Sequence, residues 1–132
     1  MNSIISVCIE SNGKKDKVEI SENDNDLSRF LFKVNSLKNA SGKLILSSEE
    51  ISLFDFETED DEATSTTQLI DATRLYKVIH KLHLAIVNKE ILDLDGIFRH
   101  PQLFYDSFDK FYGIIKTASD DNAKVQIIDF YS

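Results

Sequence analysis

The chain has 132 residues, and 15 lysines and arginines against 23 aspartates and glutamates give a formal net charge of −8. About 130 residues is near the commonest domain size, and an apolar content of 42% suffices for one packed core. Cys8 is the only cysteine, which excludes an internal disulfide and favours a reducing compartment. The apolar runs are too short for a membrane-spanning helix, which needs ~20 residues.

The acidic charge also argues against nucleic-acid and anionic-membrane partners, because each of these binds a basic face. Residues 1–9 lack the basic segment and the apolar run of a signal peptide, so we expect a cytoplasmic protein. The sequence contains no phosphate-binding glycine loop, no serine nucleophile elbow and no HExxH zinc motif. We therefore predict no catalytic residue, no cofactor and no enzymatic activity.

Alternating apolar residues predict a strand over residues 3–10 and a second strand over residues 17–21. Asn12 and Gly13 lie between them and tolerate positive φ, which is typical of a tight turn. We expect a hairpin whose loop is somewhat longer than two residues.

A helix is predicted next, capped by the side-chain oxygens of residues 23–26 and ending within residues 39–42. Its apolar residues recur at helical spacing: Leu27, Phe30, Leu31, Val34 and Leu37. An alternative is a strand over residues 30–34, because Phe30, Phe32 and Val34 also alternate. Two strands are then predicted over residues 43–46 and 50–56, with a turn at Ser47-Ser48, followed by an acidic loop over residues 57–64.

The longest helix is predicted to begin at residues 65–67, capped by one of three hydroxyls, and to reach about residue 88. A second helix should run from Pro101 to about residue 118, and residues 124–131 should form the last strand. The predicted order is β-β-α-β-β-α-α-β. We therefore expect a single α+β domain over residues 1–132, with a mostly antiparallel sheet of about five strands and two or three helices packed on one face.

The acidic charge is concentrated: eight acids and no base lie within residues 49–62. A fixed negative field attracts a basic surface and speeds encounter, so this segment is the predicted binding surface for a basic protein partner. Two alternatives remain, a solvated loop without a partner and a site for a hard cation such as Mg²⁺ or Ca²⁺. The candidate partner-binding residues are the acids Asp55, Glu57, Glu59, Asp60, Asp61 and Glu62, with Tyr105 and Tyr112 as aromatic anchors.

Other groups able to carry chemistry are interpreted as structural. His80 and His83 are three residues apart on the predicted long helix, where packing and hydrogen bonding are commoner than Zn²⁺ ligation with a third ligand such as His100. Cys8 is expected to be buried in a strand. Asp93 and Asp95 could act in acid–base chemistry, but exposed acids are ordinary in a connector.

These observations favour a non-enzymatic protein-binding module. The specific hypothesis is a bacterial immunity protein or antitoxin that neutralises a toxin, a nuclease with a basic active site, through its acidic surface. The alternatives are a chaperone for a secreted effector, a small metal-dependent hydrolase or nuclease that uses the acidic cluster, and a phage-derived inhibitor of nucleases or DNA-binding proteins. The sequence does not predict the oligomeric state.

Overall fold

The computed structural model describes residues 3–20 and 25–131. Strand β1 (Ser3–Ser11) forms antiparallel ladders with β2 (Lys14–Glu19) and with β6 (Lys124–Tyr131). Ser11 pairs with Lys14, so the β1–β2 turn consists of Asn12 and Gly13 alone, with φ of 53° and 78°. The prediction of a longer loop is wrong, because positive φ at both turn residues matches the strand twist and lets pairing resume at once.

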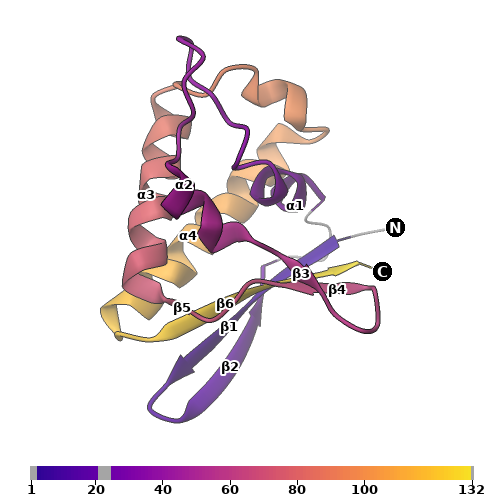
Figure 1. The fold of residues 1–132 in the computed structure, drawn as a ribbon, viewed down its shortest axis with the longest axis vertical. Coiled ribbons are helices and arrows are strands. Elements are labelled where there is room, and N and C mark those ends of the chain that lie inside the picture. Colours follow the sequence, from indigo (N-terminus) through magenta and orange to yellow (C-terminus); the bar gives the residue numbers. More distant parts are fainter. Residues whose placement is uncertain (1–2, 21–24, 132) are drawn as a thin grey trace.

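The sheet continues beyond β6 through three short strands, β3 (Glu57–Thr58), β4 (Thr64–Thr66) and β5 (Ile70–Asp71). The strand order is β2-β1-β6-β4-β3, with β5 also paired to β6, and every pair is antiparallel. Figure 1 shows the helices gathered on one side of this sheet. The predicted α+β class and the mostly antiparallel sheet are confirmed, with six strands where about five were expected.

Four α-helices and two 3₁₀ helices lie among the described residues. The longest are α3 (Ala72–Val87) and α4 (Pro101–Asp120), and α1 (Asn25–Phe32) packs against α4 and β1. The short ones are α2 (Ser48–Ile51), η1 (Ser52–Phe54) and η2 (Leu94–Ile97). None of these helices combines the length and the apolar character needed to cross a membrane.

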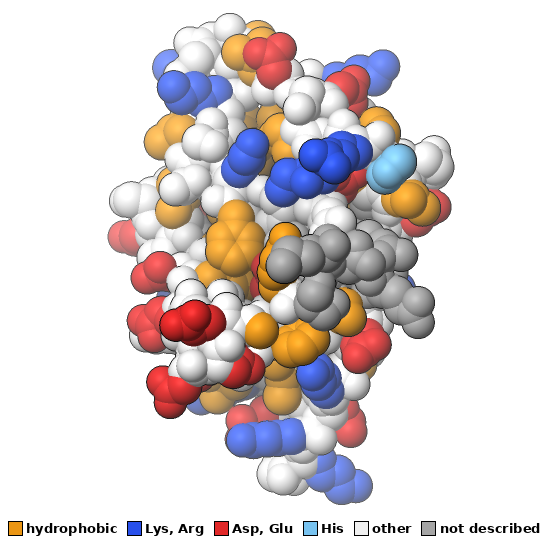
Figure 2. All heavy atoms as spheres, turned by 90° about the vertical axis from the view of Figure 1, so that its right-hand side faces the viewer, with side chains coloured by type: hydrophobic (Ala, Val, Ile, Leu, Met, Phe, Trp, Pro, Cys, Tyr) orange, Lys and Arg blue, Asp and Glu red, His pale blue; other side chains and the backbone are white. Residues whose placement is uncertain are grey.

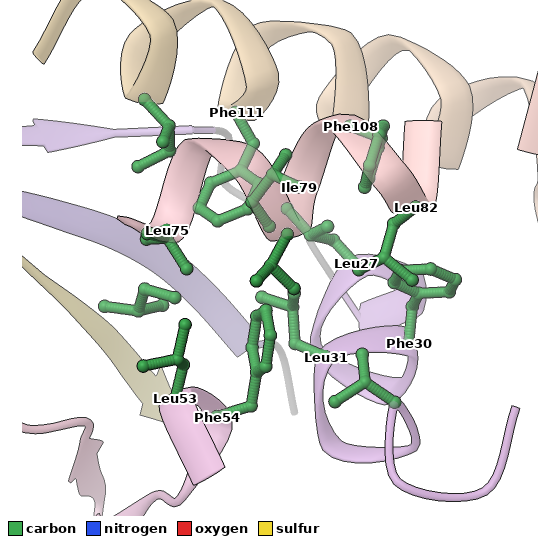
Figure 3. Close-up of a cluster of buried hydrophobic side chains, with 14 of the residues drawn as sticks. Leu27, Phe30, Leu31, Leu53, Phe54, Leu75, Ile79, Leu82, Phe108 and Phe111 are labelled. Atoms are coloured by element: carbon green, nitrogen blue, oxygen red, sulfur yellow. The ribbon is translucent and has the colours of Figure 1, made fainter. Parts of the chain in front are cut away.

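One hydrophobic core joins the helices to the sheet. Figure 3 shows side chains from α1, η1, α3 and α4 converging in it. The largest fully buried side chains include Phe30, Phe104, Phe108 and Phe111. Their rings contact one another at centroid distances of 5.1 to 6.4 Å, so an aromatic cluster holds α1 against α4.

The region between α1 and β3 differs most from the prediction. Helix α1 ends at Phe32, although Val34 and Leu37 remain buried. A four-residue turn follows, in which the Ser36 hydroxyl donates to the Lys33 carbonyl, and such local bonding competes with helix continuation. The expected strand over residues 43–46 is reduced to one isolated bridge between Lys38 and Leu44.

The expected strand over residues 50–56 is also wrong, because this segment is helical as α2 and η1. The Ser47 hydroxyl accepts from the Glu50 N–H, and the Glu50 carboxylate accepts from the Ser47 N–H at 2.8 Å. This capping box starts a helix at the serines that were predicted to form a turn.

Helix α3 begins at Ala72, five to seven residues later than predicted. Thr64–Thr66 forms β4 instead, and the next residue, Thr67, accepts from the Ile127 N–H through its hydroxyl at 3.0 Å. Consecutive β-branched threonines favour the extended backbone, and pairing with β6 overrides their capping potential. The last strand has the predicted bounds, and α4 begins at Pro101 as predicted.

Candidate binding surface

The acidic segment is a β-hairpin, where a loop over residues 57–64 was predicted. Glu57 pairs with Thr66 and Thr58 with Ser65, and the Glu59 N–H donates to the Thr64 carbonyl at 2.7 Å. We call its five carboxylates the acidic hairpin: Glu57, Glu59, Asp60, Asp61 and Glu62. It is anchored to the sheet, because β4 pairs with β6 and the Tyr131 N–H donates to the Ala63 carbonyl at 2.8 Å.

The turn of the acidic hairpin is held by its own side chains. The Asp61 carboxylate accepts from the N–H groups of Ala63 and Thr64, at 3.1 and 2.9 Å, and from the Thr64 hydroxyl at 2.8 Å. Several contacts hold the pKa of Asp61 below its usual value, and the hydrogen bond from the Thr64 hydroxyl has the largest effect. Glu62 takes a φ of 58°, and the Thr66 hydroxyl donates to Glu59 at 3.0 Å. These bonds fix the turn before any partner arrives.

The carboxylates of the acidic hairpin form no salt bridge with any residue that the structure describes. The two salt bridges found among the described residues join Arg29 to Asp26 and Lys81 to Glu50. All five residues of the acidic hairpin are exposed. Their negative charge therefore projects into solvent from one corner of the sheet, where it can attract a basic surface.

The remaining acids of the segment are placed differently. Glu50 caps α2 and pairs with Lys81 at 2.9 Å. Burial raises the pKa of Glu50, but the bonds from Ser47 and Lys81 outweigh burial and lower it overall. Asp55 is exposed and lines a polar depression of about 460 Å³ together with Arg74 and Lys124. No residue of the acidic hairpin lines this depression, so Asp55 shares a different surface feature with two cations.

Exposed aromatic side chains lie near the base of the acidic hairpin, and sequence reasoning missed them. Phe32, Phe130 and Tyr131 are 46%, 39% and 48% exposed. The Phe32 ring stacks on Phe56 at 4.5 Å, and Phe56 directly precedes β3. Phe130 pairs with Thr64 across the β4–β6 ladder. One feature of the sequence could have indicated that Phe32 is exposed. Phe32 falls outside the apolar stripe of its helix, so the pattern does not place its ring in the core.

The two predicted tyrosine anchors lie on α4, and no contact joins them to the acidic hairpin among the described residues. The Tyr112 hydroxyl bonds to the Tyr76 hydroxyl at 3.0 Å and to His80 Nδ1 at 2.8 Å, and the His83 ring stacks on Tyr112 at 4.6 Å. The bond to Tyr76, followed by desolvation, raises the pKa of Tyr112. The Tyr112 hydroxyl is therefore already hydrogen-bonded between α3 and α4.

Tyr105 lies two helical turns before Tyr112 and is half-buried. Its ring packs edge-on against Phe98 and Phe104, at 6.4 and 5.5 Å. Burial and the nearby Asp95 charge raise its pKa. Tyr105 also lines a depression of about 560 Å³ at the end of α3, so the structure divides the predicted site residues between two separate surfaces.

The other candidate groups are dispersed. No cluster of three or more His, Cys, Asp or Glu side chains suited to a metal ion occurs in residues 3–20 and 25–131. His80 and His83 pack against Tyr112, and His100 is exposed at the start of α4. Cys8 is half-buried, where a buried cysteine was predicted, because its neighbour Val7 takes the core-facing position of the strand.

Comparisons of the chain with protein-family models, with curated proteins and with solved structures gave no match.

Proposed function

We propose that this protein is a non-enzymatic binding module that captures a basic protein partner through the acidic hairpin. The supporting observation is the combination of five exposed carboxylates, none in a salt bridge among the described residues, with exposed aromatic side chains near them. Carboxylates steer a basic partner and set its orientation. Aromatic side chains supply most of the binding energy once water is displaced from the contact.

The rigidity of the acidic hairpin also supports the proposal. Asp61 and Thr66 fix the turn, and β4 ties it to the centre of the sheet. A surface that is ordered before binding loses less conformational entropy when the complex forms.

The specific form of the proposal is an immunity protein or antitoxin that acts in the bacterial cytoplasm. Its partner would be a nuclease toxin, since an enzyme that cuts nucleic acid carries a basic cleft to hold phosphates. The acidic hairpin would occupy that cleft and exclude the substrate. A small protein with a fixed acidic turn is well suited to this form of inhibition.

The test is capture from extracts of the native host with three immobilised proteins. The first is the wild type, the second is the triple variant E57Q/D60N/E62N, and the third is the control E90Q/D109N/D120N, which removes the same charge from exposed positions elsewhere. Asp61 is left intact because it holds the turn. Asn is chosen at position 62 because it tolerates the positive φ found there.

We expect a basic protein that the wild type and the control retain and the triple variant loses. The purified partner should cut RNA or DNA, and an equimolar amount of this protein should abolish the cleavage. A partner that binds the triple variant as well as the control would exclude the acidic hairpin as the binding surface. A partner without nuclease activity would exclude the toxin hypothesis and leave the binding module standing.

A further inference from the structure

A basic patch lies on the same face as the acidic hairpin, and the proposed capture of a basic partner does not use it. Its centre is the buried carboxylate of Asp26, which accepts from the N–H groups of Arg99 and His100, at 3.1 and 2.7 Å, and forms a salt bridge with Arg29. These contacts bring two separate segments together at the start of α4. Lys33 directly follows the end of α1, four residues after Arg29, and is exposed. We call Arg29, Lys33, Arg99 and His100 the basic patch.

The basic patch remains positive after its internal pairing is counted. Among the described residues, Asp26 forms a salt bridge with Arg29, whereas Lys33 and Arg99 form none. The side chains of Lys33 and Arg99 therefore give the patch a positive charge on a chain whose net charge is −8. Figure 2 shows Lys and Arg side chains gathered above the centre of this face and Asp and Glu side chains at its lower left.

A stacked pair of phenylalanine rings lies between the two charged regions. Phe32 directly precedes Lys33 in the chain, its ring stacks on Phe56 at 4.5 Å, and Phe56 directly precedes Glu57. The order across the surface is therefore basic patch, stacked phenylalanine pair, acidic hairpin. Hydrophobic side chains are visible between the blue and red regions in Figure 2.

A face with this order is complementary to itself. A two-fold axis that lies in the interface, perpendicular to the line joining the charged regions, places each acidic hairpin on the basic patch of the other copy. The same operation brings the two Phe32–Phe56 pairs together near the axis. From this arrangement we propose that two copies of the chain associate through this face as a symmetric dimer.

The dimer has a consequence for partner binding, and only this consequence rests on the proposed function. The acidic hairpin cannot contact a basic partner and the basic patch of a second copy at the same time. In the dimer, the basic patch of one copy takes the position on the acidic hairpin of the other copy that a basic partner would take. The free protein is a dimer with covered carboxylates, and the complex with the partner contains a single copy of this chain.

The test is sedimentation velocity of the full chain over about 5–200 μM at ~0.1 M NaCl, where the Debye length is ~10 Å and the repulsion between two acidic molecules is screened. Two charge reversals probe the face. K33E/R99E makes the basic patch acidic, and E57K/D60K/E62K gives the acidic hairpin a net positive charge. All five side chains are exposed, and circular dichroism verifies that each variant is folded.

We expect a wild-type dimer and a loss of at least ~10-fold in dimer affinity for each variant alone, because like charges then face each other twice. An equimolar mixture of the two variants should recover the dimer, since both contacts become attractive again. The control K15E/K17E makes the same charge change on β2 at the opposite edge of the sheet and should leave the dimer intact.

A wild type that stays monomeric up to 200 μM overturns the dimer, and so does a mixture that fails to associate. If K15E/K17E weakens the dimer as much as K33E/R99E does, net charge and not this face is responsible. The proposed function is tested separately by partner capture. A monomeric wild type whose partner is lost in E57Q/D60N/E62N would remove the dimer and leave the proposed function intact.

Discussion

The seam between α3 and α4 and the acidic hairpin are both rich in polar and aromatic groups, but they use them in opposite ways. In the seam, the Tyr112 hydroxyl bonds to Tyr76 and His80, and the ring of His83 covers it. In the acidic hairpin, the carboxylates form no salt bridge among the described residues, and Phe32 and Phe130 beside it remain exposed. The seam satisfies its groups internally, whereas the hairpin presents them to solvent.

This difference predicts which region contributes to stability and which would be available for the proposed binding. Groups that are satisfied inside the fold contribute to the free energy of unfolding, and their removal is costly. Exposed, unpaired groups contribute little to stability and are available to a partner. Substitutions in the two regions should separate the contribution to stability from the contribution to binding.

The largest effect is expected from Phe108→Ala in the core beneath the seam. The Phe108 side chain is 2% exposed and its ring contacts Phe30 and Phe104, each at 5.7 Å. Its removal leaves a cavity, so the free energy of unfolding in urea should fall by ~3–5 kcal/mol. Leu103→Ala, at a 55% exposed position of the same helix, is the control and should cost less than ~1 kcal/mol. Equal losses would mean that α4 is not packed as described.

The second effect concerns Asp26, whose carboxylate ties the start of α4 to α1. Asp26→Asn should cost ~1–3 kcal/mol at neutral pH, because it removes charge-assisted hydrogen bonds. Burial raises the pKa of Asp26, but the bonds from His100, Arg29 and Arg99 outweigh burial and lower the pKa below 3.8.

A lowered pKa fixes the direction of the pH dependence. The stabilisation by the Asp26 carboxylate is present above the unfolded-state pKa of about 3.8 and is lost as the pH falls through the folded-state pKa. Urea unfolding measured between about pH 6 and pH 3 should therefore show the wild type and Asp26→Asn converging in stability at the acidic end. A difference that stays constant down to pH 3 would contradict the assigned role of the carboxylate.

A smaller effect is expected from Tyr112→Phe in the seam. The variant keeps the ring and removes the hydroxyl that bonds to Tyr76 and His80, so the free energy of unfolding should fall by ~0.5–1.5 kcal/mol. Because this hydroxyl is engaged inside the molecule, affinity for the captured partner should stay unchanged. A large loss of affinity without a loss of stability would restore Tyr112 as the anchor that the sequence predicted.

The smallest effect on stability is expected from the triple variant E57Q/D60N/E62N. All three side chains are exposed and outside any salt bridge among the described residues, so the free energy of unfolding should change by less than ~0.5 kcal/mol. Thermal and urea unfolding beside the wild type check this value. Marked destabilisation would show that the carboxylates serve the fold, and loss of partner binding could then no longer be assigned to the surface.

The sequence predicted well where one periodicity was strong and uncontested. The alternation in residues 124–131 and the helical stripe that contains Phe104, Phe108 and Phe111 led to correct elements, because burial of one face decides the backbone there. It failed where local hydrogen bonds compete with periodicity. Ser47 and Glu50 form a capping box inside a segment that alternates like a strand, and the threonines read as helix caps join the sheet.

The candidate site was predicted in part for a related reason. Charge is local in the sequence, so Glu57 and its acidic neighbours could be placed on one segment without a fold. Proximity across the chain is not local, and nothing in the sequence placed Phe32 on Phe56 or Asp26 beneath Arg99. Tyr105 and Tyr112 were predicted as anchors because their aromatic character is visible in sequence, whereas the bonds that occupy Tyr112 are not.

The most direct test of the central claim is the rate constant of association with the captured partner, measured by stopped flow at about 20 mM and about 300 mM salt. The wild type and the control E90Q/D109N/D120N should associate rapidly at low salt and at least ~10-fold more slowly at high salt, as expected for electrostatic steering. E57Q/D60N/E62N should associate slowly at both concentrations. Association of the triple variant at the wild-type rate in low salt would contradict the claim that the acidic hairpin is the binding surface.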